Sequence, residues 1–91
     1  MNELVSILIP VHNREHLIAE TLHSALSQTY QNIEVIVVDN ASTDNTWQIV
    51  QDFAEKDHRV KAFRNDINLG PVRNWRRCVD EAIGFYGKIL W

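Results

Sequence analysis

Blocks of apolar residues recur along this 91-residue chain, and they predict the strands of a sheet. Residues 4–11 (LVSILIPV) and 33–39 (IEVIVVD) are dominated by aliphatic and β-branched side chains. Such near-continuous apolar runs are typical of strands that are buried on both faces. A shorter run at 60–64 predicts a third strand, and residues 88–91 predict the start of a fourth.

The segments between these runs have apolar residues at helical spacing. After Asn13, a favourable N-cap residue, the apolar positions 18, 22, 25 and 26 predict a helix that ends near Gln28. The polar turn at 40–45 is expected to provide the N-cap of a second helix. The candidates for this cap are Ser42, Thr43 and Asp44, and the apolar face expected behind them is Trp47, Val50 and Phe53 or Ala54.

A third helix is predicted to start at Pro71, because the missing N–H of proline is tolerated in the first turn. Gly84 or Gly87 is expected to end it. Its buried stripe is predicted to be Val72, Trp75, Val79, Ala82 and Ile83.

Alternating strands and helices predict an α/β fold: an open, mostly parallel sheet with helices on both faces. No linker or repeat divides residues 1–91, so a single domain is expected. Open sheets of this kind bind ligands at the carboxyl ends of their strands.

Composition narrows the possible partners. The net charge of −3 argues against a nucleic-acid-binding surface. Positive charge is concentrated at Arg73, Arg76 and Arg77, for which a solvated helix face is the favoured interpretation. No apolar run approaches the length of a membrane span, and the N-terminus lacks the features of a secretory signal. Cys78 is expected to be a small residue of the core. Because it is the one cysteine, it cannot form an internal disulfide, which indicates a reducing compartment.

Two polar residues at the predicted strand ends are candidates for chemistry. Asp39 follows four aliphatic residues, so its carboxylate requires hydrogen-bond donors. These donors are either the N–H groups of Ala41 and Ser42 in the following turn, or an N–H or hydroxyl group of a ligand. His12 is either a surface histidine or a ring that stacks on a base or approaches a phosphate.

Several familiar sites are missing from the sequence. Residues 10–15 (PVHNRE) contain no glycine, which excludes the glycine-rich dinucleotide-binding turn, and no P-loop pattern is present. The histidines at 12, 16 and 23 do not have zinc-site spacing.

The sequence resembles family 2 glycosyltransferases over essentially its whole length. Residues 5–13 (VSILIPVHN) resemble the opening strand of that family. Residues 27–30 (SQTY) and 34–44 (EVIVVDNASTD) resemble its most specific block, and NLG at 68–70 followed by Arg73 and Asn74 resembles a third segment. The resemblance implies the N-terminal, nucleotide-sugar-binding half of a Rossmann-like GT-A domain, with strand order 3-2-1-4.

The resemblance also implies a nucleotide site, made of Pro10, Val11, His12, Asn13, Glu15, Asp39 and Arg73. The first four residues would line the base and the ribose, and Asp39 would accept a hydrogen bond from the base. Glu15 would lie near the ribose. Arg73 would lie near the diphosphate, whose oxygens a guanidinium group binds well.

The sequence departs from the family pattern in two respects. His12 replaces the usual tyrosine, and the D-x-D motif would follow residues 88–91, beyond this chain. The Mg²⁺ or Mn²⁺ expected for the full-length enzyme therefore has no ligands here, and no catalytic residue is assigned. We expect residues 1–91 to be the part of the domain that precedes this motif.

Two functional hypotheses follow. The first is the donor-binding part of a glycosyltransferase that takes a UDP-, dTDP- or GDP-sugar and transfers the sugar to a polysaccharide, lipid or protein. Such an enzyme of cell-envelope synthesis would be cytoplasmic, at the inner face of the membrane. The second is a non-catalytic α/β module that binds a nucleotide or pairs with another chain. The apolar residues 89–91, as an unpaired edge, predict a homo-oligomer.

Overall fold

The structure of the protein is a computed structural model that describes residues 3–89, with side chains described up to residue 84. Strands and helices alternate along it. In chain order they are β1 (Val5–Val11), α1 (Ile18–Leu26), β2 (Ile33–Asn40), α2 (Thr46–Lys56), β3 (Val60–Asn65), α3 (Pro71–Glu81) and β4 (Phe85–Ile89). The first three strands and the three helices confirm the predicted alternation. β4 starts at Phe85, ahead of the segment 88–91 predicted from sequence, and the last two residues of that segment lie outside the described part.

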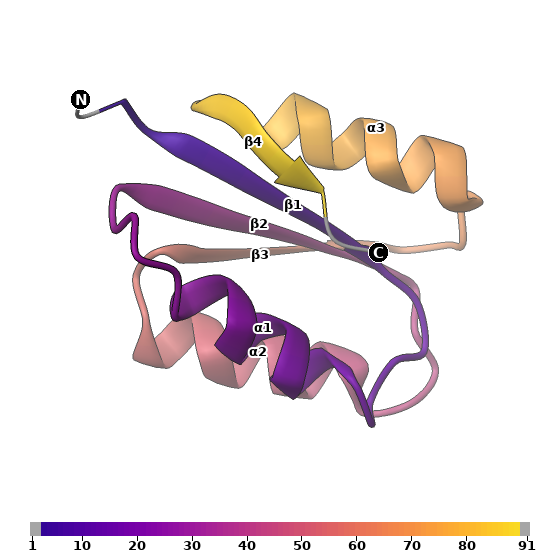
Figure 1. Ribbon diagram of the computed structural model, residues 1–91. Coiled ribbons are helices and arrows are strands. Elements are labelled where there is room, and N and C mark those ends of the chain that lie inside the picture. The colour runs from indigo at the N-terminus through magenta and orange to yellow at the C-terminus, as the bar shows by residue number, and fades with distance from the viewer. Residues whose placement is uncertain (1–2, 90–91) are drawn as a thin grey trace.

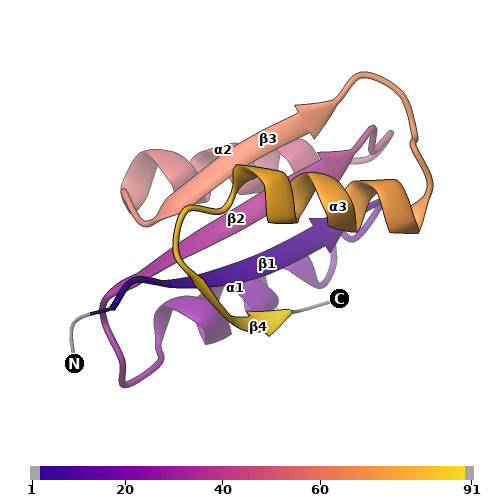
Figure 2. The same cartoon turned by 90° about the horizontal axis from the view of Figure 1, so that it is seen from above.

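The strands form one parallel sheet in the order β3-β2-β1-β4. Figure 1 shows α1 and α2 on one face of the sheet and α3 on the other, as predicted. The register pairs Val11 with Asp39, and Asn40 with Asn65, at the carboxyl ends of the strands. Figure 2, seen from above, shows that these ends lie together near the start of α3. The polar residues that follow each strand therefore meet at one edge.

Each face of the sheet has its own apolar cluster. On the face of α1 and α2, alternate residues of β1 and β2, such as Ile7 and Val35, pack against Leu22 and Val50. On the α3 face the buried cluster is Leu8, Ile36, Val38 and Cys78. β2 is buried along its whole length, which confirms the prediction made from its continuous apolar run.

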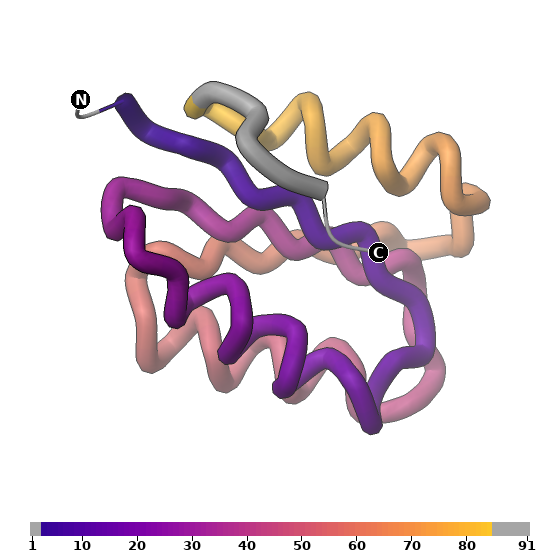
Figure 3. The backbone as a smooth tube through the Cα atoms, in the orientation of Figure 1, coloured from indigo at the N-terminus to yellow at the C-terminus, as the bar shows by residue number. Residues whose placement is uncertain are grey.

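α1 begins later than the sequence predicted. Asn13 has a φ of 50°, in the left-handed region, and is not its N-cap. The helix starts at Ile18, whose N–H donates to the carbonyl of Arg14 at 2.8 Å, and ends at Leu26. The reason is that the Asn13 side chain bonds to the neighbouring loop, as described below. Figure 3 shows the chain leaving β1 and β2 at the same end of the molecule.

α2 has the predicted apolar face: Val50 is buried, and Trp47, Phe53 and Ala54 pack against the same core. The N-cap position is Asn45, one residue after the last predicted candidate, and its side chain makes no capping bond. Asp44 takes over part of that function. Its Oδ1 accepts hydrogen bonds from the N–H and the hydroxyl of Thr46, at 2.9 and 2.6 Å.

α3 faces the sheet with a different side from the one predicted. Asn74 and Cys78 are buried, whereas Val72 and Ile83 are 78% and 75% exposed. Only Val79 and Ala82 of the predicted stripe pack against the buried cluster beneath α3. The rotation follows from polar contacts, because the Asn74 amide donates to the carbonyl of Val38 at 3.2 Å inside the protein. The apolar pattern alone does not contain this information.

The end of α3 also differs from the prediction. The helix ends at Glu81, with Ala82 as its C-cap, before either predicted glycine. Among the helices that the structure describes, none has the length and apolar character needed to cross a membrane. The expected association through residues 89–91 concerns side chains outside the described range, so it stays a prediction.

Candidate functional site

Two loops at the carboxyl edge of the sheet are tied together by hydrogen bonds. The N–H of Asn13, in the β1–α1 loop, donates to Oγ of Ser42 at 2.8 Å, and Asn13 Oδ1 accepts the N–H of Thr43 at 2.9 Å. The next residue, Arg14, donates its N–H to Oγ1 of Thr46 at 2.8 Å. Side chains of each loop thus bond to backbone or side-chain groups of the other, and these bonds hold the two loops together.

Glu15 continues this contact between the loops. Its carboxylate accepts the N–H of Asn45 at 2.9 Å, and its own N–H donates to Asp44 Oδ2 at 3.3 Å. Desolvation would raise the pKa of Asp44, but hydrogen bonds from Thr46 and from the Glu15 N–H hold it below the usual value. Asn13 and Glu15 therefore fasten the two loops. Both line a shallow hollow on this side, with Arg14, His16, Leu17 and Asp44.

Asp39 is completely buried behind this edge. One carboxylate oxygen accepts the hydroxyl of Ser42, and the other accepts the Ser42 N–H at 3.2 Å and lies 3.2 Å from Nε of Arg64. Of the two interpretations made from sequence, this is the one in which the carboxylate binds the following turn. A hydrogen bond from a base would require the buried Asp39 carboxylate to become accessible, so that role stays a prediction.

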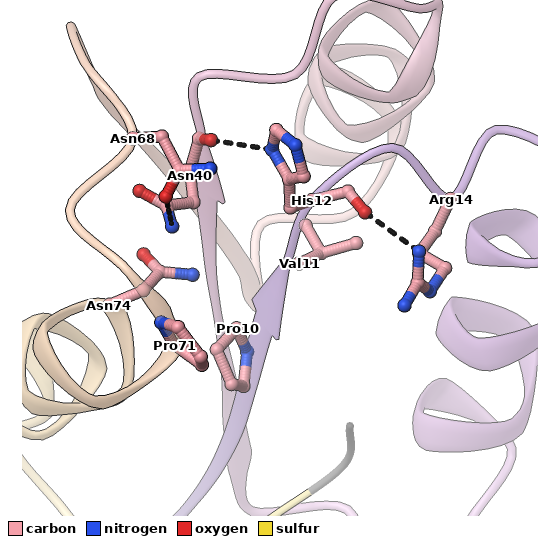
Figure 4. Close-up of a pocket in the computed structure, with 8 residues that line it drawn as sticks. All are labelled: Pro10, Val11, His12, Arg14, Asn40, Asn68, Pro71 and Asn74. Carbon is pink, nitrogen blue, oxygen red and sulfur yellow. Dashed lines mark hydrogen bonds between the residues drawn. The ribbon is translucent and has the colours of Figure 1, made fainter.

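A cavity of about 270 Å³ opens at the carboxyl ends of β1 and β2, beside the first turn of α3 (Figure 4). It is lined by Pro10, Val11, His12, Arg14, Asn40, Asn68, Pro71 and Asn74. Of the site residues expected from sequence, the structure brings three to this cavity. These are Pro10, Val11 and His12, and they come from the end of β1 and the loop after it.

The other expected residues lie elsewhere. Asn13 and Glu15 line the neighbouring hollow, Asp39 is buried, and Arg73 is exposed on α3 outside the set of cavity-lining residues. The arginine that does line the cavity is Arg14. Its Nη1 donates to the carbonyls of His12 and Asn13, at 3.0 and 3.1 Å, which leaves other N–H groups of this exposed guanidinium for an anion.

His12 is held in a defined orientation. Its Nδ1 lies 2.7 Å from the carbonyl oxygen of Asn40 (Figure 4), and a carbonyl oxygen only accepts hydrogen bonds. Nδ1 therefore carries a hydrogen, and this bond fixes the plane of the ring. The ring is half-buried, so it offers the cavity a fixed planar surface.

Asparagines are the residues that the sequence interpretation missed. Asn40, Asn68 and Asn74 line the cavity with amide groups, and Asn65 lies buried behind them. Asn68 and Asn74 do fall within the third segment that carries the family resemblance, so a signal existed, but no role was assigned to them. Amides, a ring and an arginine together suit a planar group that bears oxygen atoms and a negative charge.

The described residues do not form a metal site. They contain no group of three or more His, Cys, Asp or Glu side chains placed to hold an ion. The side chains around the cavity are amides, prolines, a histidine and an arginine, which is not the oxygen-rich anionic set that Mg²⁺ prefers. The cavity formed by the described residues therefore does not fit a divalent cation.

Comparison with known sequences identifies close relatives. The chain is 48% identical over 88 residues to the UDP-Glc:alpha-D-GlcNAc-diphosphoundecaprenol beta-1,3-glucosyltransferase WfaP of Escherichia coli. That match covers 97% of this chain and 34% of the relative. The chain spans about a third of the length of the curated relatives it matches.

Solved structures share the fold. The mannosyltransferase PcManGT of Pyrobaculum calidifontis, in complex with GDP-Man and Mn²⁺, superposes with a TM-score of 0.83 at 28% identity, over 92% of this chain and 26% of that one. TarS of S. aureus, in complex with UDP-GlcNAc, gives 0.79 at 34% identity, over 88% of this chain and 24% of that one.

The family model described as glycosyl transferase family 2 matches residues 6–87, which includes the three helices, β2, β3, most of β1 and β4, and the whole cavity. This match agrees with the resemblance that the sequence shows over essentially its whole length. The chain belongs to glycosyl transferase family 2.

Proposed function

We propose that residues 1–91 form the N-terminal nucleotide-binding part of a GT-A glycosyltransferase domain, which holds the nucleotide of a sugar donor. The observation that carries the proposal is the cavity at the carboxyl ends of β1 and β2. Its position agrees with the general rule for open α/β sheets. Within this domain, the strand order 3-2-1-4 would make β4 the strand that continues the sheet toward the rest of the protein.

The cavity residues suit the parts of a nucleotide. Pro10 and Pro71 provide apolar surface for a base, and His12 provides a ring held in one plane. The amides of Asn68 and Asn74 suit carbonyl and hydroxyl oxygens. Arg14 at the cavity suits a phosphate, because guanidinium groups bind phosphate oxygens in pairs. Arg73, also exposed near the start of α3, is proposed as a second phosphate contact.

We propose UDP-, dTDP- or GDP-sugars as donors. The support comes from relatives and neighbours: TarS is in complex with UDP-GlcNAc, and PcManGT with GDP-Man. The acceptor is proposed to be a cell-envelope polysaccharide or a lipid-linked intermediate, because the relative WfaP is named for a diphosphoundecaprenol acceptor. Such an acceptor would place the whole protein at the inner face of the membrane.

The transfer step belongs to the whole protein. PcManGT is in complex with Mn²⁺, and we propose that a divalent cation assists the whole protein too, held by residues outside those described here. Residues 1–91 are therefore expected to bind a donor nucleotide without transferring its sugar, because binding alone does not lower the barrier to a reaction.

An NMR titration of the 91-residue chain with UDP, dTDP and GDP tests the proposal. We expect shifts in the backbone amides of residues 11–15, 39–42, 68–70 and 72–74, with a Kd of about 1 mM, or about −4 kcal/mol. His12→Ala should weaken binding severalfold. His58→Ala is the matched control, because His58 is exposed and does not line the cavity.

The pattern of shifts decides between the hypotheses. A titration that leaves these segments unshifted, or an equal effect of the two histidine variants, would contradict the nucleotide site. The non-catalytic interaction module would then be the better hypothesis. Shifts in Asp39 and Glu15 would show whether these two buried or half-buried residues take part, as the family resemblance implies.

A further inference from the structure

The asparagines at the cavity are joined behind its wall by Asn65. This side chain is buried at the end of β3. Its Nδ2 donates to Oδ1 of Asn40 at 3.0 Å and to Oδ1 of Asn74 at 2.9 Å. Asn40 in turn donates through Nδ2 to Oδ1 of Asn68 at 2.8 Å. Four amides from β2, β3, the β3–α3 loop and α3 thus form one connected network.

An amide can be turned by 180° with little change in shape, so its direction has to be set by its partners. Here two partners can only donate. Nη1 of Arg77 donates to Oδ1 of Asn65 at 2.8 Å, and the N–H of Leu69 donates to Oδ1 of Asn40 at 2.9 Å. Each fixes its amide with the oxygen toward the donor and the nitrogen toward the next asparagine.

Two further partners can only accept, and they require the same direction. The carbonyl of Val38 accepts from Nδ2 of Asn74 at 3.2 Å, and the carbonyl of Gly70 accepts from Nδ2 of Asn40 at 3.4 Å. These four one-way partners agree, and so does the N–H of Gly70, which donates to Oδ1 of Asn68. Reversing Asn65 would place its oxygen against the Oδ1 atoms of Asn40 and Asn74, because neither of those amides is free to turn with it. It would also place the Asn65 nitrogen against the donor Nη1 of Arg77.

The direction of the network decides what the cavity offers to a ligand. Oδ1 of Asn68 accepts from Asn40 and also from the N–H of Gly70, at 2.8 Å, so the Nδ2 of Asn68 remains available. Nδ2 of Asn74 has two hydrogens, and Val38 takes one of them. Both asparagines line the cavity, and Figure 4 shows Asn74 between Asn40 and Pro71. Each of these two asparagines therefore has a spare hydrogen-bond donor at its Nδ2.

We propose that Asn65 is a positioning residue for the nucleotide site, with Arg77 as its anchor, and that together they fix Asn68 and Asn74 as donors to oxygen atoms of the nucleotide. This rests on the proposed function and deepens it. Neither Asn65 nor Arg77 lines the cavity, so both act through the amides that do.

Arg77 is well placed to be this anchor. Besides Asn65, its Nη1 donates to the carbonyl of Arg64 at 2.9 Å, and its guanidinium lies 5.8 Å from the centroid of the Phe63 ring. Its Nε lies 3.5 Å from the carboxylate of Glu81, one turn along α3. These contacts hold a donor-only group against the far side of the network.

The first test is Asn65→Asp. The variant keeps the shape and the oxygen that faces Arg77, but it places a second oxygen where Nδ2 donated to Asn40 and Asn74. We expect the affinity for UDP and for GDP, measured by NMR titration, to fall about tenfold. Asn45→Asp is the matched control, because Asn45 is exposed and its side chain makes no capping bond. A folded Asn65→Asp variant that binds as tightly as the control would overturn the proposal.

The second test leaves every asparagine in place. Arg77→Met removes the donor, whereas Arg77→Lys keeps one. We expect Arg77→Met to weaken UDP binding about fivefold and Arg77→Lys to restore it to within about twofold of the unmodified chain. Arg76→Met controls for the loss of charge, since Arg76 is exposed on the same helix. Equal losses in the methionine and lysine variants would show that a donor at position 77 is not what matters.

A ligand-free measurement separates this proposal from the proposed function. In the spectrum of the free protein, the side-chain NH₂ of Asn65 should exchange slowly with water, and Arg77→Met should accelerate that exchange. Protected Asn65 protons in a chain that binds no nucleotide would contradict the proposed function and leave the network's direction established. Rapid exchange of these protons in the unmodified chain would overturn the network itself.

Discussion

The α3 face of the sheet has a buried polar group at each end, and the two groups are built differently. At the carboxyl ends of the strands, neutral asparagine amides surround a cavity. At the amino ends, the carboxylate of Glu34 is 2% exposed and lies among donors from three other segments. Both groups hold loops against the sheet, but only the first lines a cavity of the described residues.

The amino-end group is a carboxylate bound by four donors of the protein. Glu34 accepts the hydroxyl of Ser6, Nζ of Lys61 at 3.0 Å, and the N–H groups of Ile83 and Gly84 at 2.7 and 3.1 Å. Burial would raise the pKa of Glu34, but these hydrogen bonds together hold it below its usual value. Oε2 accepts three of these bonds and Oε1 accepts the bond from Lys61, so both oxygens of the carboxylate are bound within the protein.

The connection between α3 and β4 is pressed close to this carboxylate. A Cβ atom on Gly84 would lie 2.6 Å from the carbonyl oxygen of Leu4 and 2.9 Å from Oγ of Ser6, which is too close for any other residue. Glu34 therefore fixes the position at which the chain enters β4. The comparison teaches that a buried charged group bound by four donors of the protein fastens the fold, while a neutral network with spare donors is available to a ligand.

Cys78 lies on the side of α3 that packs against the sheet, between the two polar groups. The reactivity of its thiol is the largest effect that we expect. Burial raises the pKa of this thiol to about 12, from a usual value of 9.0. We expect its reaction with a disulfide reagent at pH 8 to be at least about a thousandfold slower in the folded chain than in denaturant. Fast labelling of the folded chain would show that α3 is not held down at either end.

Glu34→Gln breaks the amino-end group. The NH₂ group of the amide would face groups that can only donate, such as the N–H of Ile83 or the ammonium group of Lys61. Lys61 would also lose its anionic partner. We expect the free energy of unfolding, from denaturant titration at pH 7, to fall by about 3 kcal/mol. Glu55→Gln, at an exposed residue of α2, is the control and should have almost no effect. A similar small effect at both positions would remove the distinction between the two ends of the sheet.

The two ends should also differ in their response to acid. Because the pKa of Glu34 is lowered on folding, its contribution is fully present above the usual value of 4.5 and is lost as the pH falls through the lowered value. Unfolding free energies measured from pH 7 down to pH 2 should therefore decline more steeply in the unmodified chain than in Glu34→Gln. The asparagine network has no acidic member and should contribute no such slope.

Asp57 provides a check on that interpretation. The Arg59 side chain, which donates to it at 2.8 Å, lowers the pKa of Asp57 to about 2. This effect has the same sign but acts at lower pH, below the usual value of 3.8. Asp57→Asn should flatten only that lower part of the curve. A curve unchanged by both variants would contradict both assignments.

The parts of the fold that depend on apolar patterning were predictable from the sequence. β2 and the packing face of α2 follow directly from runs and spacings of apolar residues. The rotation of α3 was not predictable in this way, because the helix turns Asn74 toward the sheet and exposes Val72. The hydrogen-bond partner of Asn74, Val38, lies 36 positions away in sequence, so no local sequence pattern predicts that bond.

The residues of the candidate site were also predictable only where local sequence determines them. Pro10, Val11 and His12 were found because they follow a predicted strand at the edge where ligands bind. Asp39 was recognised as a buried carboxylate that needs donors, but one donor, Arg64, comes from the neighbouring strand β3. Which donors a buried group finds is a property of strand register, and register is set by the packing of the whole sheet.

The smallest expected effect concerns backbone conformation at the carboxyl end. Ala41 and Asn13 both have left-handed φ values, of 55° and 50°. A side chain in this region is destabilising by about 1–2 kcal/mol, which Ala41→Gly would relieve, although glycine also gains freedom in the unfolded chain. We expect a net increase of about 0.5 kcal/mol in unfolding free energy, measured by denaturant titration.

Asn13→Gly relieves the same strain but loses the bond from Thr43, so we expect it to be destabilising. If both variants were stabilising, the hydrogen bond between Asn13 and Thr43 would contribute less free energy than relief of the backbone strain. The conformation of the two loops would then depend on the sheet and not on this bond.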